Sequence, residues 1–294
     1  MTLTGELDVQ QLPSGPWWLT HRKRQLTQLL RNRTAVIGLL LVAAVLLAAL
    51  LAPWVAPYDP TALGIKTLAG PSWSHPFGTD ELGRDVLSRV LYGARISPII
   101  GVVPVLIGTS IGTCLGLLAG YLSGAVDSII MRLIDVLLAF PGLVLAIAVV
   151  AILGPGLSNA MIAVGVGNIP IFARVVRGSI LVEKERDYVN AARQLGAPTW
   201  WILVREVLPN IMGPVIVLGT LGIAASILAA AGLSFIGLGA QQPTPEWGAM
   251  LSEGRQYLQG QWWIATFPGI AIATTVLGIN LLGDGLREIF DPRL

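Results

Sequence analysis

The sequence predicts an all-α, polytopic membrane protein with six transmembrane helices. Of its 294 residues, 54% are hydrophobic and only 12% are charged, a balance too apolar for a soluble domain. Several uncharged stretches approach the roughly 20 residues that a helix needs to cross a bilayer. The 34 glycines fit the same class, because small residues let membrane helices approach one another closely. A net charge of +2 is too small to suggest a nucleic-acid partner.

The apolar runs define the expected spans. They cover residues 35–51, 96–119, 136–153, 156–173, 210–238 and 264–282. With its flanks the first run predicts a helix over residues 35–57. It is too long for a signal peptide and is followed by prolines rather than a cleavage site, so we expect it to be retained. One run also carries a glycine at every fourth position, which predicts a tightly packed helix face: Gly108, Gly112, Gly116 and Gly120.

Polar segments separate these runs. Residues 1–34 are predicted to form a cytoplasmic N-terminal segment, residues 58–95 an extracytoplasmic segment, and residues 283–294 a cytoplasmic tail. The five-helix core spans residues 96–282. Within the extracytoplasmic segment we expect an amphipathic helix that begins at Thr79, with Asp80 and Glu81 in its first turn, where the helix dipole favours acids. His75 has no second metal-ligand residue nearby and is predicted to lie on the surface.

The distribution of basic residues predicts the orientation. If the N-terminus is cytoplasmic, the inner segments hold 14 of the 19 Lys and Arg residues: five before the first span, Arg132, six between 174 and 205, and two at the C-terminus. Positive charge favours the cytoplasmic side. The outer segments then hold the remaining five: Lys66, Arg84, Arg89, Arg95 and Arg255.

The sequence offers no catalytic machinery and no metal site. Both histidines lie outside the spans, and none of the three lysines follows a glycine as in a phosphate-binding loop. The single cysteine, Cys114, is predicted to be a small packing residue. No span carries a charge well inside it, which disfavours a proton- or sodium-driven carrier without eliminating one. A solitary carrier or channel stays open as an alternative to a subunit energised by a partner.

A polar stretch over residues 190–209, which we call the elbow, interrupts the apolar pattern. Its sequence NAARQLGAPTWWILVREVLP predicts two short helices. Gly196 ends the first helix, Pro198 fits the first turn of the second, and Pro209 is expected to stop that second helix. The elbow lies between two spans on the predicted cytoplasmic side, where a soluble protein could bind it.

The elbow resembles the EAA loop of ABC importer permeases. The matching positions are Ala191, Ala192, Gly196, Leu208 and Pro209. Asn190 stands where that family usually has Glu, and Glu206 stands where an apolar residue is usual. Residues 75–97, 120–142, 232–251 and 278–292 resemble recurring blocks of the C-type permease of dipeptide and oligopeptide importers.

This resemblance implies a type I ABC importer permease fold in a bacterial inner membrane. It also implies three kinds of partner: a homologous second permease, two ABC ATPase subunits and an extracytoplasmic solute-binding protein. ATP and Mg²⁺ would be bound by the ATPases and no cofactor by this chain. Coupling to the ATPases is expected within residues 174–209, through Asn190, Ala191, Ala192, Gly196, Ala197, Pro198, Leu208 and Pro209.

Two roles stay open at this stage. Pro243, Pro245, Glu246 and Trp247, within the outer segment 240–263, either contact the binding protein or belong to an ordered loop that folds back on the spans. Trp200 and Trp201 are expected to be anchors at the membrane interface. The resemblance favours peptide uptake, with nickel or glutathione uptake as the nearest alternative. The absence of a His, Cys or acid cluster in the spans argues against metal coordination by this chain.

Overall fold

A computed structural model describes residues 31–290, and within that range the regular elements are helices, apart from one isolated β-bridge. Much of the predicted N-terminal segment, and the last residues of the C-terminal tail, lie outside the described residues. Five helices are long and apolar enough to cross a membrane, and a bent pair of shorter helices is the candidate for a sixth crossing. Each of the six predicted spans falls on one of these five helices or on the bent pair.

The elements follow one another as a series of long helices joined by short ones. Their bounds are α2 Arg33–Val55, α3 Val86–Leu122, α4 Gly124–Leu138, α5 Gly142–Leu153, α6 Leu157–Glu183, α7 Asp187–Gln194, α8 Thr199–Trp201, a π-helical turn Ile202–Val207, α9 Leu208–Phe235, α10 Trp247–Gly254, a 3₁₀ turn Arg255–Tyr257 and α11 Trp263–Phe290. The helix α11 continues past residue 282, so the first part of the predicted tail is helical.

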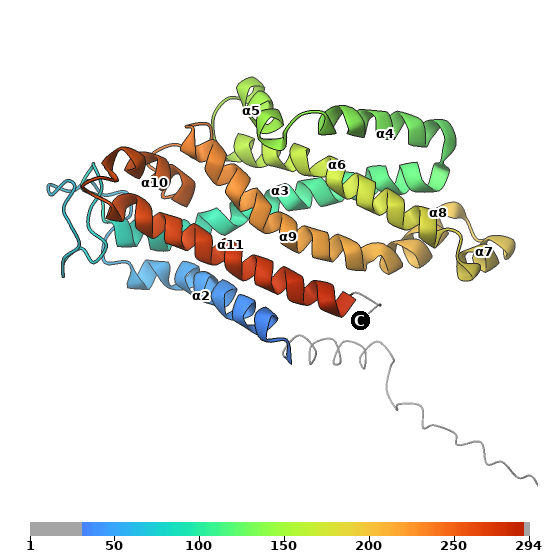
Figure 1. Cartoon of the computed structure of the whole chain (residues 1–294), viewed down its shortest axis with the longest axis horizontal. Helices are drawn as coiled ribbons and strands as arrows, with labels where there is room; N and C mark the ends of the chain where they lie inside the picture. The colour runs from blue at the N-terminus through green and yellow to red at the C-terminus, as the bar shows by residue number, and fades with distance from the viewer. Residues whose placement is uncertain (1–30, 291–294) are drawn as a thin grey trace, which may run out of the picture.

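The long helices run side by side, with connecting segments gathered at the two ends (Figure 1). The helices α7 and α8 lie at one end together with the end of α11, and α10 lies at the other end with the loop that precedes α3. The start of α2 also belongs to the first end, because the Asn32 amide donates a hydrogen bond to the Glu288 carboxylate of α11. We call these the elbow end and the outer end.

The glycine face of α3 packs directly on α6. A Cβ added at Gly108 would lie 2.5 Å from Cβ of Asn168, and one added at Gly112 would lie 2.6 Å from Cβ of Phe172. Gly116 and Gly120 approach the following turns of α6 in the same way. The predicted close packing is confirmed.

The prediction for Cys114 is wrong, because its side chain is exposed. Side chains two residues apart on a helix point to nearly opposite faces. Cys114, midway between Gly112 and Gly116, therefore points away from the contact with α6.

The predicted start of the amphipathic helix is also wrong. Thr79 pairs with Asp85 in an isolated antiparallel bridge, and the helix begins only at Val86. Asp85 caps it, since its carboxylate accepts a hydrogen bond of 2.8 Å from the backbone N–H of Ser88. The same helix then runs without a break to Leu122, so no separate surface helix exists in this region.

The predicted span over residues 136–153 is broken. The axes of α4 and α5 differ by 92°, and the bend falls at Ala139–Pro141. Proline disfavours a helical conformation of the residue before it, which explains why the helix ends here. The apolar composition of this stretch did not reveal the turn.

Candidate functional site: the elbow and the outer end

The elbow has the predicted helix, turn and helix. The helix α7 ends at Gln194, and Gly196 follows with φ of +78°, in the left-handed region that glycine adopts without strain. The backbone N–H of Ala197 donates to the carbonyl of Ala192 at 3.1 Å, which closes the turn. Pro198 is extended and immediately precedes α8, so it stands just ahead of the helix rather than inside its first turn.

Pro209 does not stop the second helix, contrary to the sequence prediction. The helix continues from Thr199 to Phe235 through the π-helical turn Ile202–Val207. In that turn the N–H of Leu208 donates to the carbonyl of Leu203, five residues back. A wide turn of this kind lets the chain accommodate a proline that has no N–H of its own. The elbow is therefore continuous with α9.

A buried apolar face fixes the elbow to the spans. Val189, Ile202 and Val207 are each at most 1% exposed. They belong to one core cluster with residues of α6 and α9, namely Phe172, Val176, Ile180, Ile211 and Val215. Because both arms of the elbow share this core, the elbow is packed firmly on α6 and α9 and is not a loose loop.

The hydroxyl of Tyr188 ties three elements together ahead of the elbow. It donates a hydrogen bond of 2.6 Å to Oε1 of Glu183 on α6 and accepts one of 3.0 Å from Nδ2 of Asn210 on α9. Burial, and after it the hydrogen bond to Glu183, raises the pKa of Tyr188 to about 12. The phenol thus stays protonated and keeps donating at neutral pH. Sequence inspection did not single out this residue, because its partners lie on two other helices.

The predicted coupling residues divide into an exposed and a half-buried set. Ala191, Gly196, Pro198 and Pro209 are exposed, whereas Asn190, Ala192, Ala197 and Leu208 are half-buried. The Asn190 side chain accepts a 3.3 Å hydrogen bond from Nη1 of Arg193, so it remains within the elbow itself.

Two large apolar side chains on the elbow are strongly exposed. Leu195 is 88% exposed and Trp200 is 66% exposed, on the two sides of the Gly196 turn. Trp201, in contrast, is half-buried in the core cluster, with the Arg205 guanidinium 5.9 Å from the centre of its ring. Leu195 lies within the predicted coupling loop, but it was not among the residues named there. An apolar residue directly before a helix-ending glycine, within a polar stretch, was the signal that could have identified it.

At the outer end, most of the residues predicted to contact a binding protein are buried. Trp247 is 1% exposed, and its indole N–H donates to the carbonyl of Val90 at 3.0 Å. Glu246 is 2% exposed and caps α10 by accepting hydrogen bonds from the backbone N–H groups of Gly248 and Ala249. Pro245 is also buried, and only Pro243 is exposed. This geometry matches the alternative in which the segment folds back on the spans.

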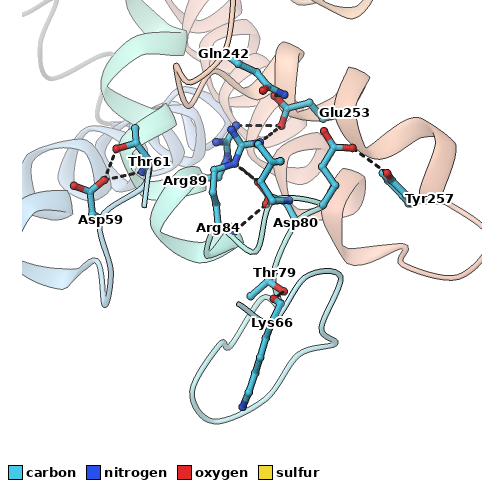
Figure 2. Close-up of polar contacts among 12 residues, drawn as sticks. Asp59, Thr61, Lys66, Thr79, Asp80, Arg84, Arg89, Gln242, Glu253 and Tyr257 are labelled. Atoms are coloured by element: carbon cyan, nitrogen blue, oxygen red, sulfur yellow. Dashed lines mark hydrogen bonds and ion pairs between the residues drawn. The ribbon is translucent and has the colours of Figure 1, made fainter. Parts of the chain in front are cut away.

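A buried ionic cluster holds the outer end together (Figure 2). Arg84 and Arg89 are 1% and 0% exposed and share the acids Asp80 and Glu253. Arg84 Nε donates to Asp80 at 2.6 Å, and both arginines donate to Oε2 of Glu253, at 2.9 Å and 3.2 Å. Burial raises the pKa of Glu253, although the two guanidinium groups oppose this shift. The cluster joins the segment before α3 to α10.

His75 belongs to the same end but is not a plain surface residue. Its Nδ1 lies 3.0 Å from Oδ1 of Asp85, and its ring stacks on Tyr58 at 4.8 Å between centroids. It is half-buried rather than fully on the surface, where the sequence predicted it. Three large apolar side chains are also strongly exposed here: Leu63, Ile65 and Trp73, at 74%, 103% and 104%.

Comparison with known families decides what kind of membrane protein this is. Residues 112–294 match the family described as binding-protein-dependent transport system inner membrane component. The chain belongs to this family. Residues 17–71 also match the N-terminal transmembrane domain of oligopeptide transport permease C. The resemblance seen in the sequence is therefore confirmed, and the chain is a permease component of an ABC importer.

Individual relatives are similar over nearly their whole length. The di/tripeptide transport system permease protein DppC of Pseudomonas aeruginosa is 48% identical over 270 residues, covering 90% of this chain and 89% of the relative. The dipeptide transport system permease protein DppC of Escherichia coli is 49% identical over 271 residues, covering 90% of each. The glutathione transport system permease protein GsiD of Shigella flexneri is 52% identical over 266 residues, covering 90% of this chain and 88% of the relative.

A solved structure supports the fold. An inward-facing form of the MetNI methionine ABC transporter contains a chain that superposes with a TM-score of 0.55 at 19% sequence identity. The match covers 68% of this permease and 96% of that chain. The fold is that of a type I ABC importer permease, as the resemblance implied.

Proposed function

We propose that this permease moves dipeptides and other short peptides across a bacterial inner membrane into the cytoplasm, as one half of the pathway of an ATP-driven importer. The observation that carries the proposal is the likeness to dipeptide and di/tripeptide permeases over 90% of the chain. The energy comes from partner subunits, since this sequence holds no phosphate-binding loop. ATP and Mg²⁺ are bound by those partners.

The assembly comprises this chain, a homologous second permease, two ABC ATPase subunits and an extracytoplasmic solute-binding protein. The elbow is the ATPase contact, through Asn190, Ala191, Ala192, Gly196, Ala197, Pro198, Leu208 and Pro209. We add the exposed Leu195 and Trp200 as its apolar anchors, because solvent-exposed apolar side chains on a rigid polar element are typical of interaction sites. Closure of the ATPases on ATP pushes the elbow, and the shared core passes the motion to α6 and α9.

The elbow end faces the cytoplasm, together with both termini. The support is the charge bias in the sequence, in which 14 of the 19 basic residues lie on that side. The cluster at the outer end strengthens this argument. Two of the five outer cations, Arg84 and Arg89, are buried against Asp80 and Glu253, so they do not oppose the bias as free charges.

The binding protein docks at the outer end. Of the four residues first considered for this contact, Pro243 remains available, whereas Pro245, Glu246 and Trp247 are buried in the chain's own packing. The exposed apolar side chains Leu63, Ile65 and Trp73 of the segment before α3 lie at the same end and form the better candidate surface.

Glutathione is the second candidate substrate. A glutathione permease is as similar to this chain as the dipeptide permeases are. Glutathione is itself a short peptide with free carboxylates and an ammonium group, so the two possibilities share most of their chemistry. Discrimination between them rests with the separate binding protein.

The test is a pull-down of the tagged permease from mild detergent, followed by uptake measurements in proteoliposomes. We expect a second permease, two ATPases and a binding protein to co-purify, and uptake of a labelled dipeptide to require ATP. Uptake of glutathione but not of dipeptide would select the second candidate. Recovery of the chain alone, active in vesicles without ATP, would establish a solitary carrier and refute the proposal.

A further inference from the structure

The outer end carries a long loop that presents large apolar side chains to solvent. The loop runs from Ala56, where α2 ends, to Asp85, which caps α3. It projects beyond the ends of α2, α3 and α11, on the side opposite the elbow (Figure 1). Ile65 and Trp73 are fully exposed, and Leu63 is 74% exposed. Exposed apolar side chains grouped in this way are typical of surfaces that bind another molecule.

Hydrogen bonds within the loop hold it in one conformation. The backbone N–H of Gly64 donates to the carbonyl of Leu82 at 3.2 Å, and that of Thr79 donates to the carbonyl of Ala69 at 2.9 Å. The Thr79 hydroxyl donates to the carbonyl of Lys66 at 2.7 Å. The exposed side chains therefore stand on an ordered backbone. A surface that is ordered in advance loses less conformational entropy when a partner binds to it.

A pocket of about 260 Å³ opens in this loop. Its lining includes four residues with apolar surface and one imidazole: Tyr58, Ala62, Leu63, Ile65 and His75. The imidazole is fixed, because it stacks on the Tyr58 ring and its Nδ1 lies 3.0 Å from Oδ1 of Asp85. An apolar cavity of about 150 Å³ can hold benzene, so this pocket has room for a side chain with an aromatic ring.

The position and composition of the loop favour a protein over lipid as its partner. Lipid surrounds the sides of membrane-spanning helices, whereas this loop extends past their ends (Figure 1). Charged side chains of the same loop are also exposed, namely Asp59 and Lys66. An apolar centre with charged residues near it is typical of protein interfaces, which have an apolar core and a polar rim.

We propose that this pocket receives a large apolar side chain, of the size of an aromatic ring, from the solute-binding protein. The binding protein is the partner that meets the importer at the outer end, and the family to which the chain belongs is described as binding-protein-dependent. A single large side chain buried in a pocket commonly supplies much of the affinity of an interface. The identity of the partner rests on the proposed function, whereas the pocket and its size do not.

Filling the pocket tests the proposal. In the assembled complex in lipid nanodiscs, Ala62→Trp adds an indole at the pocket wall, from a residue that is itself exposed. Thr67→Trp is the matched control, because Thr67 is exposed on the same loop and does not line the pocket. We expect the affinity for the co-purified binding protein to fall at least about tenfold in Ala62→Trp and less than about threefold in Thr67→Trp. Equal affinities in the two variants would overturn the proposal.

A fluorophore on the loop tests which molecule covers it. An environment-sensitive dye is attached to Trp73→Cys in the complex with Cys114→Ser, and the same complex without Trp73→Cys gives the background signal. We expect emission typical of water before the binding protein is added and a shift to shorter wavelength afterwards. Quenching by brominated lipid would place the loop against the membrane. A short-wavelength emission before the addition would show that another subunit covers it. Either result would overturn the proposal.

The controls separate failure of the pocket from failure of the proposed function. If no binding protein docks on the unaltered complex, the proposed function and the assignment of the pocket both fail. If it docks equally well on the unaltered complex and on Ala62→Trp, only the assignment of the pocket fails. Co-purification of the second permease and the ATPases verifies assembly in each variant. Should Ala62→Trp not assemble, Ile65→Ala decides, because removal of a pocket wall should also weaken docking at least about tenfold.

Discussion

The left-handed backbone at Gly196 gives the sharpest test of the elbow as a lever. A Cβ at this position would meet nothing within 4 Å, so a substitution changes the backbone preference and not the packing. An L-residue in the left-handed region costs about 1–2 kcal/mol, which corresponds to a roughly 5- to 30-fold smaller population of the native turn. Valine is strained most, because its β-branched side chain is least compatible with a φ of +78°.

We expect ATP-dependent peptide uptake in proteoliposomes to be highest in the unaltered complex and to fall in the order Gly196→Asn, Gly196→Ala, Gly196→Val. Asparagine adopts the left-handed conformation more readily than other L-residues, so Gly196→Asn should retain most of the uptake. ATP hydrolysis by the complex should persist in Gly196→Val while uptake falls. Gly260→Val is the control, because Gly260 is equally unhindered and lies outside the left-handed region. Normal uptake by Gly196→Val, or equal losses in all three variants, would refute the argument.

Three further predictions concern single contacts. Tyr188→Phe removes a hydrogen-bonding hydroxyl worth about 1 kcal/mol and should lower the unfolding temperature. Because the pKa of Tyr188 is raised from 10.0 to about 12 in the folded protein, this stabilisation is complete below pH 10 and is lost as the pH rises through about 12. The difference in absorbance at 295 nm between the protein and the variant measures the ionisation of Tyr188. Gly112→Val forces its Cβ against Phe172 and should cost about 1–3 kcal/mol in thermal unfolding, whereas Gly142→Val, which meets no neighbour, should cost less. Asn190→Glu restores the commoner motif residue and should leave co-purification of the ATPases intact; loss of the ATPases would show that their groove requires the amide.

Local sequence was sufficient for much of the fold. A run of about 20 uncharged residues has few alternatives to a membrane-spanning helix, because its backbone polar groups must be satisfied within the helix itself. The glycines at every fourth position from Gly108 to Gly120 likewise predicted a packed helix face, and the structure shows that its partner is α6. The turn at Gly196 was predictable because the conformational preference of glycine is a property of the single residue.

In both helix-boundary errors, the surrounding backbone overrode the preference of a single residue. Thr79 has the chemistry of a helix cap, but the chain there is held by the bridge to Asp85 and by buried Arg84 and its distant partner Glu253. Pro209 has the chemistry of a helix breaker, but a π-helical turn ahead of it absorbs the missing hydrogen bond.

The sequence by itself determined that this protein is a polytopic membrane protein with a helix–glycine–helix elbow between two apolar helices, because hydropathy and backbone preference are local. The tertiary structure decided which side chains are available to act. It buried Glu246 and Trp247, left Leu195 and Trp200 exposed, and joined Asp135 of α4 to Arg174 of α6. Exposure and ion pairing depend on how separate helices pack, and this packing cannot be read from any one segment of the sequence.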